Sequence, residues 1–170
     1  MIKRDDKRGI SPVVGAVLIV ALTVFIAAMV WLVVNNLVQS KTKSSSCFET
    51  FDKVKINQEF TCYNFASNEA RVSIEIKDIQ LDAVLVSILS EGNSKSFKIL
   101  NKSSTIQGVV SYPDRNQQVS LPAKNAGKTY IVNLTLFNLN NPDSISLAPI
   151  IGENQCDFSD SLEQIPPCVS

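Results

Sequence analysis

The sequence predicts a mainly β head domain that follows one long apolar α-helix. The chain has 170 residues, which allows one compact domain and one additional segment. No charged residue occurs between Gly9 and Ser40. Beyond this stretch, short runs alternate between apolar and polar residues, and clusters of turn-forming residues separate them. The uncharged stretch indicates the helix, and the alternation indicates the β head.

The segment 10–38 is predicted to be a helix that spans a membrane. As a helix, Val13–Val34 would be about 33 Å long, which matches a hydrocarbon core of about 30 Å. β-branched residues are frequent here, but an isolated strand of this length would leave its backbone unsatisfied in lipid. Pro12 stands at the helix start, where a missing N–H costs least, and Trp31 lies near the far end as an interfacial anchor.

The charges that flank this helix predict its orientation. The leader, residues 1–9, contains four basic residues, whereas Lys41 and Lys43 are the basic residues that closely follow the helix. Because basic residues favour the cytoplasmic side, we expect the N-terminus in the cytoplasm and the head outside the cell. An ordinary secretory signal is disfavoured, because its apolar core has only about 7–15 residues and ends at a small-residue cleavage motif.

The rest of the chain is predicted to be a short linker and a β-sandwich head. Residues 39–46 are polar and charged, so we expect a flexible linker there. The head is expected to span residues 47–170. Its clearest strand is Arg71–Lys77, in which apolar side chains alternate strictly with polar ones. Further expected strands are Ala83–Leu89, Ser96–Leu100, Gly108–Tyr112, Thr129–Phe137 and Ile145–Ile151.

Two of these strands carry more specific expectations. In Thr129–Phe137, alternate apolar residues are expected to face one side, namely Tyr130, Val132, Leu134 and Leu136. Ile145–Ile151 is expected to be the last strand before a C-terminal tail. About six to eight short strands with a turn roughly every ten residues are typical of a sandwich of two antiparallel sheets.

The head contains four cysteines, Cys47, Cys62, Cys156 and Cys168. An even number of isolated cysteines outside the membrane favours disulfides over a zinc site, whose ligands usually come in close pairs. Three pairings are open. We favour Cys47–Cys62 with Cys156–Cys168, because near partners close short loops, and each bond would contribute about 3 kcal/mol. Cross-pairing would instead tie the start of the head to its tail.

The sequence points to no catalytic residue, metal site or cofactor, and we expect no enzyme activity. The chain has no histidine, which removes histidine-based triads and most zinc sites. Asp157, Asp160 and Glu163 cluster in the tail but lack the glycine and the dense acidic pattern of an EF-hand loop. The sequence has no stripe of basic residues that would indicate nucleic-acid binding. Two N-x-S/T motifs, at Asn101 and Asn133, are candidate N-glycosylation sites. Asn101 is favoured because it lies in an expected loop, whereas Asn133 lies in an expected strand.

The residues around the start of the helix resemble the N-terminal signature of archaeal type IV pilins. The matching run reads Lys7-Arg8-Gly9-Ile10-Ser11-Pro12-Val13-Val14-Gly15. Bacterial type IV pilins typically place a glutamate near the start of the helix, whereas Val14 and its neighbours are uncharged, as in the archaeal branch. The Ser11-Pro12 pair favours an adhesive pilus or a minor pilin over a motility filament. The resemblance covers about forty residues.

The resemblance implies processing, assembly and a set of partners. A prepilin peptidase would cut between Gly9 and Ile10 on the cytoplasmic side, with Lys7 and Arg8 preceding the bond. An assembly ATPase and its membrane platform would then move the helix from lipid into a filament of pilin copies. Pilins of this type often have immunoglobulin-like heads and surface glycans. The chain would then be a pilin-like lollipop, a helix that carries one head, at the cell surface.

Small residues in the helix provide surfaces for close packing against other helices. Gly15, Thr23 and Ala27 are examples, and Thr23 with Ala27 forms a small-xxx-small pair. With Ser11 and Pro12, these are the candidate assembly residues. The alternative function is a single-pass anchored binding module that never polymerises, in which the small residues have no assembly role.

Overall fold

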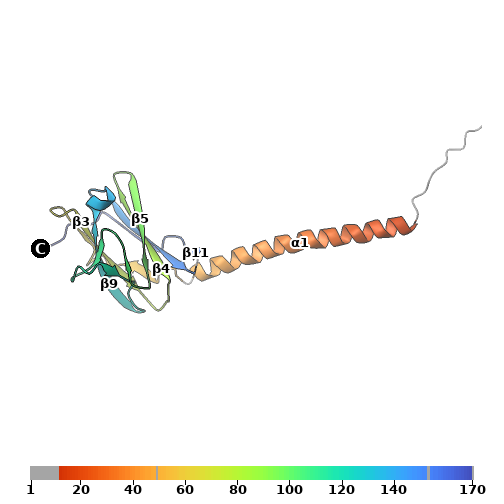
Figure 1. The fold of residues 1–170 in the computed structure, drawn as a ribbon, viewed down its shortest axis with the longest axis horizontal. Coiled ribbons are helices and arrows are strands. Elements are labelled where there is room, and N and C mark those ends of the chain that lie inside the picture. Colours follow the sequence, from red (N-terminus) through yellow and green to blue (C-terminus); the bar gives the residue numbers. More distant parts are fainter. Residues whose placement is uncertain (1–11, 49, 153, 170) are drawn as a thin grey trace, which may run out of the picture. The chain divides into compact units, whose positions relative to one another are not determined.

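The computed structural model describes residues 12–48, 50–152 and 154–169, as one helix followed by a β-rich head (Figure 1). The chain divides into two compact units, Met1–Thr42 and Lys43–Ser170. The first contains most of the helix, and the second contains the end of the helix and the whole head. A long helix and a mainly antiparallel β domain are the fold class that the sequence predicts.

The helix α1 spans Pro12–Phe48 and is therefore longer than predicted. Residues 39–46, which were expected to form a flexible linker, continue α1 without a break. Extending an existing helix needs no new nucleus, so the cost of adding each residue is small. Gln39, Lys41 and Lys43 are good helix formers, and this segment contains no glycine or proline.

The head contains two five-stranded sheets, and all their strand pairs are antiparallel. The first sheet consists of β1 (Val54–Ile56), β2 (Cys62–Asn64), β3 (Glu69–Ile76), β7 (Val109–Ser111) and β9 (Ala126–Asn133). The second sheet consists of β4 (Ala83–Ser90), β5 (Asn93–Leu100), β10 (Ser144–Ile151), β11 (Asn154–Gln155) and β12 (Asp160–Glu163). A separate pair is formed by β6 (Ser104–Thr105) and β8 (Gln118–Val119).

The strand order is that of an immunoglobulin-like sandwich. In the first sheet the order is β1-β3-β9-β7, with β2 also beside β3. In the second it is β11-β10-β4-β5, with β12 also beside β10. These orders correspond to strands A-B-E-D of an immunoglobulin domain and to G-F-C with an added C′ strand. The predicted fold class of the head is therefore confirmed down to its topology.

The hydrophobic core lies between the two sheets and takes side chains from both. In β3, the alternating residues Val72, Ile74 and Ile76 are buried, as the sequence pattern predicted. The second sheet contributes Val86 of β4 and Leu147 of β10, which are paired neighbours within that sheet. Both are fully shielded from solvent. Each sheet thus presents an apolar face, and the two faces bury each other.

The last part of one predicted strand has a different conformation in the structure. The expected strand Thr129–Phe137 ends at Asn133, and Leu134–Phe137 forms a 3-10 helix, η1. Leu134 is still buried, but Leu136 is 56% exposed instead of facing the core. The side chain of Asn133 caps η1 by accepting a hydrogen bond from the backbone N–H of Thr135. The N-cap hydrogen bond of Asn133 therefore stabilises a 3-10 turn where the sequence pattern predicted the end of a strand.

The segment expected to be a tail after Ile151 contains ordered strands. β11 and β12 both pair with β10, so β10 is not the last strand. The chain end then lies beside β2: the N–H of Tyr63 donates to the carbonyl of Pro166 at 2.8 Å, and the N–H of Cys168 donates to the carbonyl of Tyr63 at 2.9 Å. The C-terminal segment therefore covers the edge of the first sheet at β2.

Candidate functional site

The apolar part of α1 is the first candidate functional segment. Val13–Val38 is a 26-residue stretch, long and apolar enough to cross a membrane, and none of it is buried within the structure. At about 1.5 Å per residue it is about 39 Å long. Its large apolar side chains point outward on all faces of the helix and are 45–70% exposed. In water this surface would be strongly unfavourable, so it needs lipid or other apolar helices around it.

The predicted assembly residues lie at the start and in the middle of this segment. Gly15 has open space around the position that a Cβ would occupy, so its neighbours leave room for a close helix contact. The hydroxyl of Thr23 donates to the carbonyl of Val20 at 2.9 Å, which satisfies it without water. Thr23 and Ala27 are four residues apart and so share one face of α1. Pro12 is the first residue of α1.

The predicted processing site, Lys7, Arg8, Gly9 and Ile10, lies outside the described residues, as does Ser11.

Both disulfides are cross-paired, so the favoured sequential pairing was wrong. Cys47 bonds to Cys156, with a Cα–Cα distance of 5.3 Å, and Cys62 bonds to Cys168, with a Cα–Cα distance of 4.8 Å. Sequence separations of 109 and 106 residues show that each bond joins the start of the head to its end. The sandwich topology is the reason. β11 pairs with β10 just before Cys156, and the C-terminal segment hydrogen-bonds to Tyr63 of β2, next to Cys62.

The two sequons differ in how their acceptor nitrogens are used. Asn101 follows β5, and its Nδ2 donates to the carbonyl of Leu81 at 3.2 Å. Asn133 ends β9, and its Oδ1 accepts the N–H of Thr135 at 3.1 Å. No hydrogen bond uses Nδ2 of Asn133 within the part of the chain that the structure covers. The structure thus leaves the acceptor nitrogen available at Asn133 and engaged at Asn101, although the loop position of Asn101 had favoured that residue.

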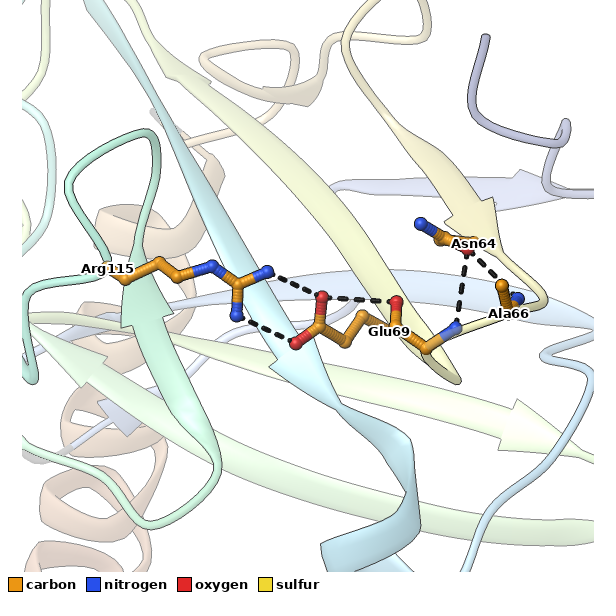
Figure 2. A network of polar contacts seen from close by, with 5 residues as sticks. Asn64, Ala66, Glu69 and Arg115 are labelled. Atoms are coloured by element: carbon orange, nitrogen blue, oxygen red, sulfur yellow. Dashed lines mark hydrogen bonds and ion pairs between the residues drawn. The ribbon is translucent and has the colours of Figure 1, made fainter. Parts of the chain in front are cut away.

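An ion pair that the sequence did not predict fastens one end of the first sheet. The guanidinium of Arg115 donates two parallel hydrogen bonds to the Glu69 carboxylate, at 3.0 and 2.9 Å (Figure 2). Ser67 adds a third at 3.2 Å. These hydrogen bonds, led by those from Arg115, lower the pKa of Glu69, and the same pairing raises the pKa of Arg115. The pair ties the loop before β8 to the start of β3 across 46 residues of sequence.

A large cavity lies beside this ion pair. Its volume is about 600 Å³, and its lining includes Glu69, Arg115, Ile131 and Asn133. Because the carboxylate and the guanidinium bind each other, neither is free to select a charged ligand. Among the described residues, no group of three or more acidic or cysteine side chains has the arrangement of a metal site. Asp160, one of the acidic residues of the predicted tail, instead accepts a hydrogen bond from the N–H of Ile56 at 2.8 Å.

A comparison with protein families matches residues 8–46 to the family described as Archaeal Type IV pilin, N-terminal. The match includes Arg8, Gly9 and Ile10 of the predicted cleavage motif and the apolar segment of α1. It supports an archaeal type IV pilin-like structural subunit. No curated protein and no solved structure matches the chain.

Proposed function

We propose that this chain, whose residues 8–46 match the N-terminal domain of archaeal type IV pilins, is a major or minor subunit of a pilus-like filament on the cell surface. The observation that carries the proposal is the 26-residue segment Val13–Val38, which is apolar on every face. Such a helix is stable in lipid or among identical helices, and transfer between these apolar environments costs little. The membrane would therefore hold the subunit before assembly.

The proposed route begins with insertion, N-terminus in the cytoplasm and head outside. Prepilin peptidase then cuts after Gly9, and the mature chain begins at Ile10. An assembly ATPase and a membrane platform would supply the work that moves subunits into the filament. The disulfides agree with a head outside the cell, because such bonds persist in oxidising surroundings.

The head is proposed to face outward in the filament and to mediate attachment, with a binding role and no enzyme activity. Of the two sequons, Asn133 is the proposed acceptor of a glycan, because its Nδ2 has no hydrogen-bond partner in the described chain whereas Nδ2 of Asn101 is engaged. Mass spectrometry of native head peptides tests this: modification at Asn101 alone would contradict the assignment.

Purification of surface filaments from the native cells tests the proposed function. Electron microscopy should show filaments, and mass spectrometry of the same sample should find head peptides together with an N-terminal peptide that begins at Ile10. If the protein is instead recovered only as single membrane-bound chains that retain the leader, the alternative holds, and the chain is an anchored binding module that does not polymerise.

A further inference from the structure

A second cavity lies at one end of the sandwich, where β10 begins and β12 ends. Its volume is about 490 Å³, within the range of about 300–1,000 Å³ typical of small-molecule sites. The lining residues that matter here are Phe65, Leu89, Asn141, Asp143, Glu163 and Gln164. Phe65 follows β2, and Leu89 lies near the end of β4. Glu163 is the last residue of β12 and Gln164 follows it, whereas Asn141 and Asp143 precede β10.

This cavity is far from the Cys47–Cys156 disulfide. The lining residue Ser144 is the first residue of β10. At the other end of β10, Ile150 pairs with Gln155, which precedes the Cys156 that is bonded to Cys47. Eight residues of strand separate the two ends by about 25 Å. The cavity is thus at the end of β10 opposite the one that lies beside the Cys47–Cys156 disulfide.

One wall of the cavity is an exposed aromatic ring held in place by a fixed turn. Phe65 is 65% exposed, and its ring makes an edge contact with the ring of Tyr63 at 4.6 Å between centroids. Asn64 fixes the turn by accepting hydrogen bonds from the N–H groups of Ala66 and Ser67 (Figure 2). Through Ser67, the turn is fastened to the Glu69–Arg115 ion pair. An exposed ring on a fixed turn is preorganised for stacking.

The rest of the lining offers polar groups that the fold itself leaves unused. The backbone around Asp143 is fixed, because its N–H donates to the carbonyl of Leu89 at 2.8 Å and its carbonyl accepts the N–H of Gln164 at 3.1 Å. One carboxylate oxygen of Asp143 accepts the N–H of Glu91 at 2.7 Å. In the described chain, the side chains of Asn141, Glu163 and Gln164 make no hydrogen bond and no ion pair.

The charge of the cavity restricts the ligand further. Asp143 and Glu163 are both acidic, and no lysine or arginine lines the cavity. Carboxylate oxygens accept hydrogen bonds from the hydroxyl groups of a sugar, and amide side chains both accept from them and donate to them. An aromatic ring covers the apolar C–H face of a sugar. Two carboxylates without a cation disfavour an anionic ligand and favour a neutral or cationic one.

We propose that this cavity binds a hexose unit of a surface polysaccharide, neutral or amino-substituted, with its ring stacked on Phe65 and its hydroxyl groups bound by Asn141, Asp143, Glu163 and Gln164. The proposal rests on the attachment role proposed above and supplies the class of ligand for it. The cavity beside Arg115 is a weaker candidate, because no aromatic ring lines it and its carboxylate is already paired.

The test uses the full chain in lipid nanodiscs and saturation-transfer NMR with methyl β-glycosides of glucose, galactose and mannose. At least one should bind, and Phe65→Ala should weaken that binding about tenfold, the loss expected for one stacked ring at the centre of a small site. Phe158→Ala is the matched control, because Phe158 is an equally exposed phenylalanine (60%) that does not line the cavity. It should leave binding unchanged.

A second comparison tests the charge argument with methyl glycosides of glucose, glucosamine and glucuronic acid. The glucuronide should bind weakest, and Glu163→Gln should reduce glucosaminide binding more than glucoside binding. Asp157→Asn, at an exposed carboxylate outside the cavity, is the control. The proposal is overturned if none of the sugars binds, if the glucuronide binds best, or if Phe65→Ala and Phe158→Ala behave alike.

These outcomes are independent of polymerisation. Filaments without sugar binding would reject the binding site and leave the filament proposal standing. Sugar binding by a chain that never forms filaments would reject the filament proposal and leave the site standing.

Discussion

At the scale of single residues, Gly9 is expected to control processing. It precedes the proposed scissile bond and is the smallest residue that the position can hold. Gly9→Leu should place a bulky side chain at the peptidase site and leave most of the protein as uncleaved precursor. Mass spectrometry of the N-terminal peptide measures this. Lys3→Ala, farther from the bond, is the control and should still yield a mature N-terminus at Ile10. Normal cleavage of Gly9→Leu would place the cut elsewhere.

The Glu69–Arg115 pair predicts a pH dependence of stability. Arg115 lowers the pKa of Glu69 in the folded state, so the pair stabilises the fold above the unfolded carboxylate pKa of about 4.3. That stabilisation is lost as the pH falls through the lower, folded pKa. Thermal unfolding of Glu69→Gln should therefore occur at a slightly lower temperature than that of the wild type at pH 7.

The difference between the two proteins should close as the pH falls below the folded pKa of Glu69, because both side chains are then uncharged. Glu59→Gln, at an exposed carboxylate outside any ion pair of the described chain, is the control and should show a smaller difference at pH 7. If the difference in unfolding temperature between Glu69→Gln and the wild type is unchanged in acid, the pair does not stabilise the fold through charge.

At the scale of elements, α1 is expected to tolerate apolar changes and to reject charge. Val24 lies within the apolar segment and is 64% exposed. A lysine near the centre of a spanning helix costs about 2.5–3.5 kcal/mol of insertion free energy. Val24→Lys should therefore lower the membrane-bound fraction and abolish filaments, measured by fractionation and electron microscopy. Val24→Leu is the matched control. Normal filaments with Val24→Lys would show that this face of α1 is not in the filament core.

At the scale of the whole molecule, the disulfide Cys47–Cys156 is expected to be a main source of stability. It closes a loop with a sequence separation of 109 residues. In the chain-entropy account, a bond that closes a loop of about 100 residues stabilises the fold by about 4.7 kcal/mol at 25 °C. Cys47→Ser with Cys156→Ser should lower the free energy of unfolding by several kcal/mol, measured by chemical denaturation of the detergent-solubilised chain.

Peptide mapping without reduction provides the control for this experiment. It should recover Cys47 linked to Cys156 and Cys62 linked to Cys168 in the wild type, and the second link alone in the double variant. Recovery of Cys47 linked to Cys62, and of Cys156 linked to Cys168, would contradict the disulfide pairing of the structure.

The sequence by itself determined the features that depend on local pattern. The uncharged run from Gly9 to Ser40 identified the helix, because membrane insertion depends on length and composition. Alternation in Arg71–Lys77 identified β3 and its buried face, because side chains on a strand alternate between two sides. The motif around Gly9 indicated the resemblance to archaeal type IV pilins, since it is a short linear signal, and the family match covers residues 8–46.

Only the tertiary structure decided which distant segments meet. Cys47 reaches Cys156 because β11 pairs with β10 just before Cys156, and sequence proximity gave the wrong pairs. Glu69 and Arg115 are 46 residues apart, and Phe65 and Glu163 are 98 apart, yet each pair contributes to one site. Such contacts depend on sheet topology, which is set by burial summed over the whole core. Local periodicity reports only which face of a strand is buried, and it leaves open which strand lies beside it.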